Sequence, residues 1–162
     1  VDRETMREIV DIARWAPSWV NYQIARYTLV DDEEIIKEIA EHGVNGFVYN
    51  IDTLRTAKGV AVLSFVKGKS GTYDKEYITS KGNSWEVFDA GIACQTFCLA
   101  AHAKGVGTCI MGVIDDKSIA KIVNLPEDET VAALIVYGYE DGEHAAPNKR
   151  KDVDEIMRFV DR

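Results

Sequence analysis

Apolar residues recur at helical spacing over the first sixteen positions of the chain. This pattern predicts an amphipathic helix over residues 3–16, with Asp2 as its N-cap. Pro17 ends the helix, because proline lacks a backbone N–H and restricts the residue before it. The apolar run that follows, at residues 26–30, predicts a strand.

A second helix is expected after this strand. Asp31 and Glu34 stand at the spacing of a capping box, apolar residues follow at helical spacing, and Gly43 provides a stop. Residues 44–58 have no dominant period and allow only a short helix. A strong strand pattern then covers residues 59–66.

The most apolar stretch predicts a long helix over residues 83–104, in which Asn83 and Glu86 again have capping-box spacing. From residue 90 to residue 101 this helix is apolar on nearly all sides, and only Gln95 and its neighbour interrupt it. Such a helix must be covered all round. We therefore expect it both in the core and at an interface between two copies of the chain.

Two glycines follow the long helix, and they predict a change of element. Gly105 and Gly107 end the helix and open a strand that runs to Val113. Asp115 starts a short helix, and Pro126 stops it.

The rest of the chain combines one clear strand with two polar connections. Residues 131–136 are the clearest buried strand, and residues 67–83 and 138–148 are expected to be loops. The length of the first loop is typical of a lid or a binding loop, although a plain surface loop fits equally well. A basic cluster at residues 149–151 precedes a last helix, which is expected over residues 153–160.

Strands separated by helical segments place the chain in the α/β or α+β class, with one sheet and one domain over residues 1–162. Hydrophobic residues make up 46% of the 162 positions, which is enough for a proper core. The formal charge of −8 opposes non-specific binding to nucleic acid or to an anionic membrane surface. No run of eighteen apolar residues is present, so no membrane span is expected. Three cysteines without a pairing pattern favour the reducing cytoplasm.

Several kinds of catalytic or metal site are disfavoured. The histidines stand in no recognisable signature with serine or cysteine. Cys94, Cys98 and His102 share one stripe of the apolar helix, where the thiols are better interpreted as core residues than as metal ligands. The glycine-rich segment 105–112 follows a helix and precedes a strand, which is the reverse of a dinucleotide-binding loop. Its glycines either cap the helix or allow the backbone to approach a flat ligand.

The segment after the first helix is the clearest candidate for a functional loop. Ser18, Asn21 and Gln23 follow Pro17 and place short hydrogen-bonding side chains between two regular elements. A turn capped by serine and asparagine would explain the same residues.

Three segments, in order along the chain, resemble the nitroreductase family of FMN-dependent oxidoreductases. The first is Ala-Arg-Trp-Ala-Pro-Ser-Trp-Val-Asn-Tyr-Gln at residues 13–23, which is similar to the family's Ala-Pro-Ser-x-x-Asn-x-Gln loop. The second is the helical segment 89–101 with the Gly-Val-Gly at 105–107. The third is Leu-Pro-Glu at 125–127 and the strand over residues 131–138.

The resemblance implies a nitroreductase-like α+β (mixed α/β) fold with a single central sheet, mixed but mainly antiparallel, flanked by helices. It also implies a homodimer with two FMN sites and with the long helix at the interface. FMN would take a hydride from NADH or NADPH and pass electrons to a small-molecule acceptor, such as a nitroaromatic or a quinone, by ping-pong chemistry. No catalytic side chain is required, because the cofactor carries the reaction.

The resemblance assigns roles by position. Ser18, Asn21 and Gln23 match the loop that reaches the flavin or its phosphate across the dimer interface. Met111 and Gly112 match the segment whose backbone lies beside the isoalloxazine ring.

Five further residues receive less specific roles from the resemblance. Arg150, together with Lys149, would pair with the FMN phosphate, although a solvated surface charge is the alternative for Arg150. Asn50 is a candidate for the edge of the ring. Trp19 or Tyr22 would form a wall of the acceptor site, unless either packs at the subunit interface.

Two departures from the family pattern keep other functions open. Ile24 and Ala25 stand where the family usually has Pro-Trp, and the N-terminal Arg-Arg-Ser-x-Arg segment, whose arginines hold the phosphate, does not precede Val1. We interpret that segment as missing rather than diverged. One alternative function is a flavin-binding or regulatory protein without turnover. Another is a family member with flavin-fragmenting or dehalogenating chemistry, whose specificity would lie in the loop 67–83.

Overall fold

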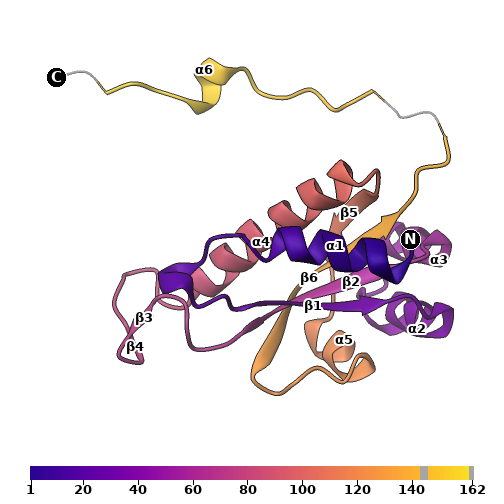
Figure 1. The fold of residues 1–162 in the computed structure, drawn as a ribbon, viewed down its shortest axis with the longest axis horizontal. Helices are drawn as coiled ribbons and strands as arrows, with labels where there is room; N and C mark the ends of the chain where they lie inside the picture. Colours follow the sequence, from indigo (N-terminus) through magenta and orange to yellow (C-terminus); the bar gives the residue numbers. More distant parts are fainter. Residues whose placement is uncertain (143–145, 161–162) are drawn as a thin grey trace.

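A four-stranded antiparallel sheet forms the centre of the computed structural model, which describes residues 1–142 and 146–160 (Figure 1). The strand order is β1-β2-β6-β5, and the strands are β1 (Ala25–Val30), β2 (Val60–Val66), β5 (Gly107–Met111) and β6 (Glu129–Gly138). Every pairing in this sheet is antiparallel within the described ranges. The expected single sheet, mainly antiparallel and flanked by helices, is confirmed.

Helices cover both faces of the sheet, and each face has its own apolar cluster. One face carries α1 (Arg3–Ala13) and α4 (Ser84–Ala103), and the other carries α2 (Glu33–His42), α3 (Val48–Thr56) and α5 (Asp116–Ile122). Side chains alternate along β2, so Ala61 and Leu63 pack toward α1 and α4 while Val60 and Val62 pack toward the other layer. The sheet is therefore buried on both faces, as its continuous apolar strands predict.

Several expected boundaries shift by a few residues. The first helix ends at Ala13 rather than at residue 16, because turns already replace helical hydrogen bonds before Pro17. The segment 44–58, which had no dominant period, forms α3. The strand expected up to Val113 ends at Met111, and α5 ends at Ile122, well before Pro126.

Both expected capping boxes are wrong. Asp32, not Asp31, caps α2 and accepts hydrogen bonds from the N–H groups of the first turn. Asp31 instead pairs with Arg3. At the start of α4 the Asn83 side chain makes no capping bond, and Glu86 reaches the neighbouring connection. A spacing alone cannot show which of two adjacent carboxylates turns toward the helix.

The last expected helix is reduced to one turn, α6 (Val153–Ile156), so its extension to residue 160 is wrong. Residues 146–160 are exposed along their whole length and run apart from the rest of the chain (Figure 1). Residues 143–145 of the expected loop 138–148 lie outside the described residues, as do residues 161 and 162 of the expected domain.

The connection 67–83 is folded rather than a bare loop. It contains a small hairpin of β3 (Thr72–Tyr73) and β4 (Glu76–Tyr77) that packs beside the start of α4 (Figure 1). The α4 helix itself is buried on the side facing the sheet and α1, but Val87, Phe88 and Leu99 are each about 60% exposed. Within the described part of the chain, no helix is long and apolar enough to cross a membrane.

Candidate functional site

The loop between α1 and β1 holds an unusual backbone conformation. Val20, Asn21 and Gln23 all have positive φ, at 46°, 54° and 51°. Asparagine adopts such angles with little cost, but a β-branched valine does so only when its surroundings force it. The Ser18 hydroxyl accepts a hydrogen bond from the Gln23 N–H at 2.8 Å and thereby closes the loop. Ser18, Asn21 and Gln23, the residues expected to act together, are thus neighbours in one constrained turn.

Asp89, on α4, holds this loop through a hydrogen bond to its backbone. Its carboxylate is 4% exposed and accepts hydrogen bonds from the Trp19 N–H at 2.9 Å and from the Ser70 hydroxyl at 2.5 Å. It therefore connects the 18–23 loop to the 67–83 connection through a single buried side chain. The sequence marked Asp89 only as part of a resemblance, because nothing in a spacing shows that a helical carboxylate turns inward to hold two distant loops.

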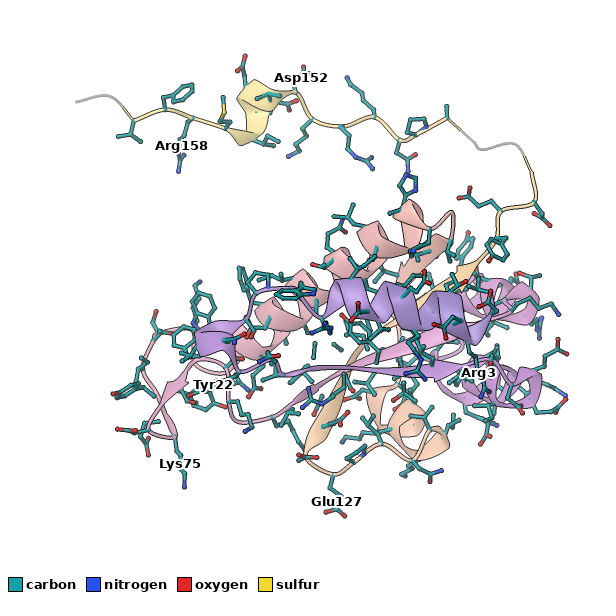
Figure 2. The ribbon with its side chains drawn as sticks, viewed as in Figure 1. Arg3, Tyr22, Lys75, Glu127, Asp152 and Arg158 are labelled. Carbon is teal, nitrogen blue, oxygen red and sulfur yellow. The ribbon has the colours of Figure 1, made fainter. Side chains whose placement is uncertain are left out.

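Trp19 and Tyr22, the two expected wall residues, have different environments. The Trp19 indole N–H donates to the Thr72 carbonyl at 2.9 Å, and its ring lies 5.1 Å from the ring of Trp85. Tyr22 is 39% exposed and points to the side of the molecule that carries the β3–β4 hairpin (Figure 2). Trp19 thus fastens the loop, and Tyr22 is the more exposed of the two; the role of either in an acceptor site remains a prediction.

A second group of candidate residues lies at the end of β5. Three hydrogen bonds fix the loop after Met111 to the α2–α3 connection and to α3. The amide nitrogen of Asn50 donates to the Val113 carbonyl at 3.0 Å, Asn45 donates to the Ile114 carbonyl at 2.9 Å, and the Asp115 N–H donates to the Gly43 carbonyl. Asn50 is itself buried. The expected ring-edge residue and the expected ring-side segment are therefore brought together.

The surroundings of Gly112 fit a flat apolar ligand. A Cβ at Gly112 would meet no atom within 4 Å, so the backbone there is open to an approaching ring. Ile110 and Val113, on either side, are each about half exposed. A separate hollow of about 450 Å³ lies at the start of β5, between Thr53 and Thr56 of α3 and the end of β6, and neither Gly112 nor Asn50 lines it. The open backbone between two half-exposed apolar side chains makes the end of β5 a reasonable cradle for a flat ring.

The two groups do not meet within one chain. The 18–23 loop precedes β1 at one edge of the sheet, and Met111 ends β5 at the other edge. Three strand spacings separate these edges, which amounts to about 14 Å before any offset along the strands. Within one chain, the 18–23 loop therefore does not reach the backbone at Gly112.

Lys149 and Arg150 belong to the exposed segment 146–160. The Arg150 guanidinium donates only to the nearby Asn148 carbonyl, at 2.9 Å. The structure brings neither residue to the other candidates. Their assignment to the FMN phosphate remains a prediction.

The thiols of the apolar helix form a pair of their own. Cys94 and Cys98 hydrogen-bond to each other, which raises the pKa of Cys94 and lowers the pKa of Cys98. Thr108 also hydrogen-bonds to Cys98 and contributes to its lowered pKa. Across residues 1–142 and 146–160, no three His, Cys, Asp or Glu side chains are grouped so that they could hold a metal ion.

The model of the Nitroreductase family matches residues 1–139. The oxygen-insensitive NADPH nitroreductase of Helicobacter acinonychis is 23% identical to this chain, and the match covers 83% of this chain and 76% of that protein.

Solved structures agree with the match. An FMN-dependent nitroreductase from Clostridium difficile R20291 is 26% identical with a TM-score of 0.76, and the match covers 98% of this chain and 88% of that one. A nitroreductase family protein from Streptococcus pneumoniae TIGR4 has the same fold, with a TM-score of 0.83 at 21% identity and coverage of 99% and 90%.

Proposed function

This chain belongs to the nitroreductase family, and from that membership we propose that it is an FMN-dependent oxidoreductase. NADH or NADPH is the electron donor, and a small nitroaromatic, quinone or related molecule is the acceptor. The observation that carries the proposal is the open backbone of Gly112, in the loop that the buried Asn50 holds through the Val113 carbonyl. We also keep the cytoplasm as the proposed location, on the basis of the free cysteines.

Bound FMN would supply the two-electron chemistry, and the protein residues would position it. Asn50 holds the loop after β5 through the Val113 carbonyl and leaves its amide oxygen available to a ring N–H. The backbone of Met111 and Gly112 would lie against the ring, and Lys149 and Arg150 would pair with the phosphate. The electron donor and the acceptor would bind at the same site one after the other, so the oxidised donor would leave before the acceptor binds. No side chain has to act as a general base.

We further propose that the working unit is a homodimer. The exposed face of α4 carries Val87, Phe88 and Leu99, an apolar strip that is costly to leave in water. Two copies that pack along this strip would bring the 18–23 loop of one chain toward the Gly112 edge of the other. Ser18, Asn21 and Gln23 would then complete a site that neither chain holds alone, and Tyr22 would line the acceptor side.

The first experiment identifies the bound ligand and then measures turnover. The purified protein is examined by visible spectroscopy, any ligand released by heat is identified by mass, and NADH and NADPH oxidation is followed with 4-nitrobenzamide and menadione. FMN together with oxidation of either donor supports the proposal. FMN without turnover supports the flavin-binding alternative, and modified flavin or released halide supports the other chemistries. A colourless protein that does not bind added FMN overturns the oxidoreductase.

The second experiment tests whether the site is shared between chains. Asn50→Ala and Gln23→Ala chains with different tags are purified as homodimers and, after co-expression, as a heterodimer. If the site spans two chains, the heterodimer has one intact site and one doubly altered site, so it retains about half of the wild-type FMN while both homodimers have lost theirs. If each site lies within one chain, both sites of the heterodimer are altered and it binds no more FMN than the homodimers.

A further inference from the structure

A hollow of about 700 Å³ lies between Tyr22 and the β3–β4 hairpin, outside the cofactor cradle. We call it the lysine hollow, and it is lined by Tyr22, Lys67, Gly68, Lys69, Thr72, Asp74 and Lys75. In Figure 2, Tyr22 and Lys75 lie at the same end of the molecule, with Lys75 on the hairpin. The hollow thus adjoins the face of the 18–23 loop that Tyr22 presents.

The charge of the lysine hollow is opposite to that of the protein as a whole. Its lining has three lysines and one aspartate, a balance of +2, whereas the chain carries −8. Lys58 and Lys104 pair with carboxylates elsewhere, but the salt bridges formed by the described residues include none of the three lining lysines. Three unpaired cations around one concave surface attract an anion.

The backbone that carries these lysines is held in place. Asp74 and Lys75 form a two-residue hairpin turn with φ of 47° and 68°, angles that glycine or asparagine adopts far more readily than lysine. The Thr72 carbonyl accepts the indole N–H of Trp19, and the Gly68 N–H donates to the buried carboxylate of Glu86. The backbone of the lysine hollow is therefore attached both to the 18–23 loop and to α4.

We propose that the lysine hollow binds the anionic group of a substrate whose aromatic part lies beside the flavin. This inference rests on the proposed function and specifies its substrate class, namely molecules that carry a carboxylate, sulfonate or phosphate. Either substrate of the reaction can supply such a group, an acidic aromatic acceptor or the 2′-phosphate of NADPH. Lys67, Lys69 and Lys75 attract the anion, Tyr22 covers the adjoining ring, and Asp74 limits the affinity.

The test compares two probes of nearly equal shape, 4-nitrobenzoate and the neutral 4-nitrobenzamide. Binding to the FMN-loaded protein is measured by calorimetry without electron donor, and KM is measured with NADH and with NADPH. The variant Lys67→Gln/Lys69→Gln/Lys75→Gln removes the charges. Its matched control, Lys37→Gln/Lys117→Gln/Lys121→Gln, changes the net charge equally on α2 and α5, where the three lysines are also exposed.

At about two- to fivefold for each exposed charge, the triple variant should weaken 4-nitrobenzoate binding roughly tenfold or more and 4-nitrobenzamide binding less than twofold. The difference should shrink in 1 M salt. Asp74→Asn should strengthen 4-nitrobenzoate binding. An effect on 4-nitrobenzoate identifies the acceptor as the source of the anion, and an effect on the KM of NADPH but not of NADH identifies the donor.

The proposed anion site is overturned if the triple variant weakens both probes equally and changes the KM of both donors equally. It is also overturned if the control variant shows the same discrimination as the triple variant. Binding discrimination in a protein without turnover supports the lysine hollow while the oxidoreductase proposal fails. Turnover without discrimination between the two probes supports the oxidoreductase proposal, while the anion site at the lysine hollow fails.

Discussion

Replacing Asp89 should loosen two distant loops at once. Its carboxylate is the shared acceptor for the Trp19 N–H and the Ser70 hydroxyl, so Asp89→Ala leaves two donors without a partner. Each buried donor left unpaired costs about 1–3 kcal/mol. Because the contact to Trp19 is only partly buried, we expect Asp89→Ala to lower the free energy of unfolding by roughly 2–4 kcal/mol. Asp89→Asn keeps one acceptor oxygen but loses the charge, and it should cost about 1–2 kcal/mol.

The assay combines global and local measurements. Urea unfolding at one protein concentration gives the stability, since a dimer would make the midpoint depend on concentration. Amide hydrogen exchange then shows where the loss falls, and we expect it in residues 18–23 and 67–73 rather than in the sheet. Tryptophan emission provides a third readout, because Trp19 and Trp85 pack together at this site.

Two variants serve as controls for Asp89→Ala. Ser70→Ala removes one of the two hydrogen bonds and should cost less, and Asp154→Ala changes an exposed carboxylate and should be neutral. In the double variant of Asp89 and Ser70 the two costs should not add. The reasoning fails if Asp89→Ala is no more destabilising than Ser70→Ala, or if exchange in the two loops rises no more than in β2.

Three further predictions concern strain, packing and charge. Val20→Gly should raise the denaturant midpoint, because it relieves about 1–3 kcal/mol of left-handed strain and costs about 0.5–1 kcal/mol of chain entropy; a lower midpoint would show that the valine side chain is needed. Gly59→Ala should be strongly destabilising in the same assay, since a Cβ there would lie 2.1 Å from the ring of Tyr137; wild-type stability would contradict this. The Arg3 guanidinium lowers the pKa of Asp31, so this pair stabilises the fold above the unfolded pKa of about 3.9 and its contribution is lost as the pH falls through the folded value. Asp31→Asn should therefore be less stable than wild type at pH 7, and the difference should shrink as the pH falls below about 3.9; a difference that does not shrink with acidification would refute the assignment.

The layered fold was predictable because it follows from hydrophobic pattern. The strands at 59–66 and 131–136 are apolar on both faces except at the buried Ser64, and a central place in a covered sheet satisfies such a pattern. The helix boundaries were less accurate. Asp31 and Asp32 are adjacent carboxylates, and the choice between them depends on the distant Arg3, which no local pattern includes.

The candidate site was predictable in its parts but not in its assembly. The polar residues of the 18–23 loop are visible in the sequence, because short hydrogen-bonding side chains after a proline are uncommon within regular elements. Glu86 and Asp89 look like ordinary positions of a helix, and Glu86 even matches a capping pattern. Their role arises only when the 67–83 connection folds back over α4, so long-range packing decides it.

The proposed homodimer also bears on the outward apolar residues of α4. One side must cover the sheet and α1, and that need accounts for Ala90, Phe97 and Ala101 in the core. It does not account for Phe88 and Leu99, which face outward. A helix whose outer side faces only water usually carries charged residues there, as α2 does on its outer side. The proposed homodimer would account both for the outward apolar residues of α4 and for the separation of the two candidate groups.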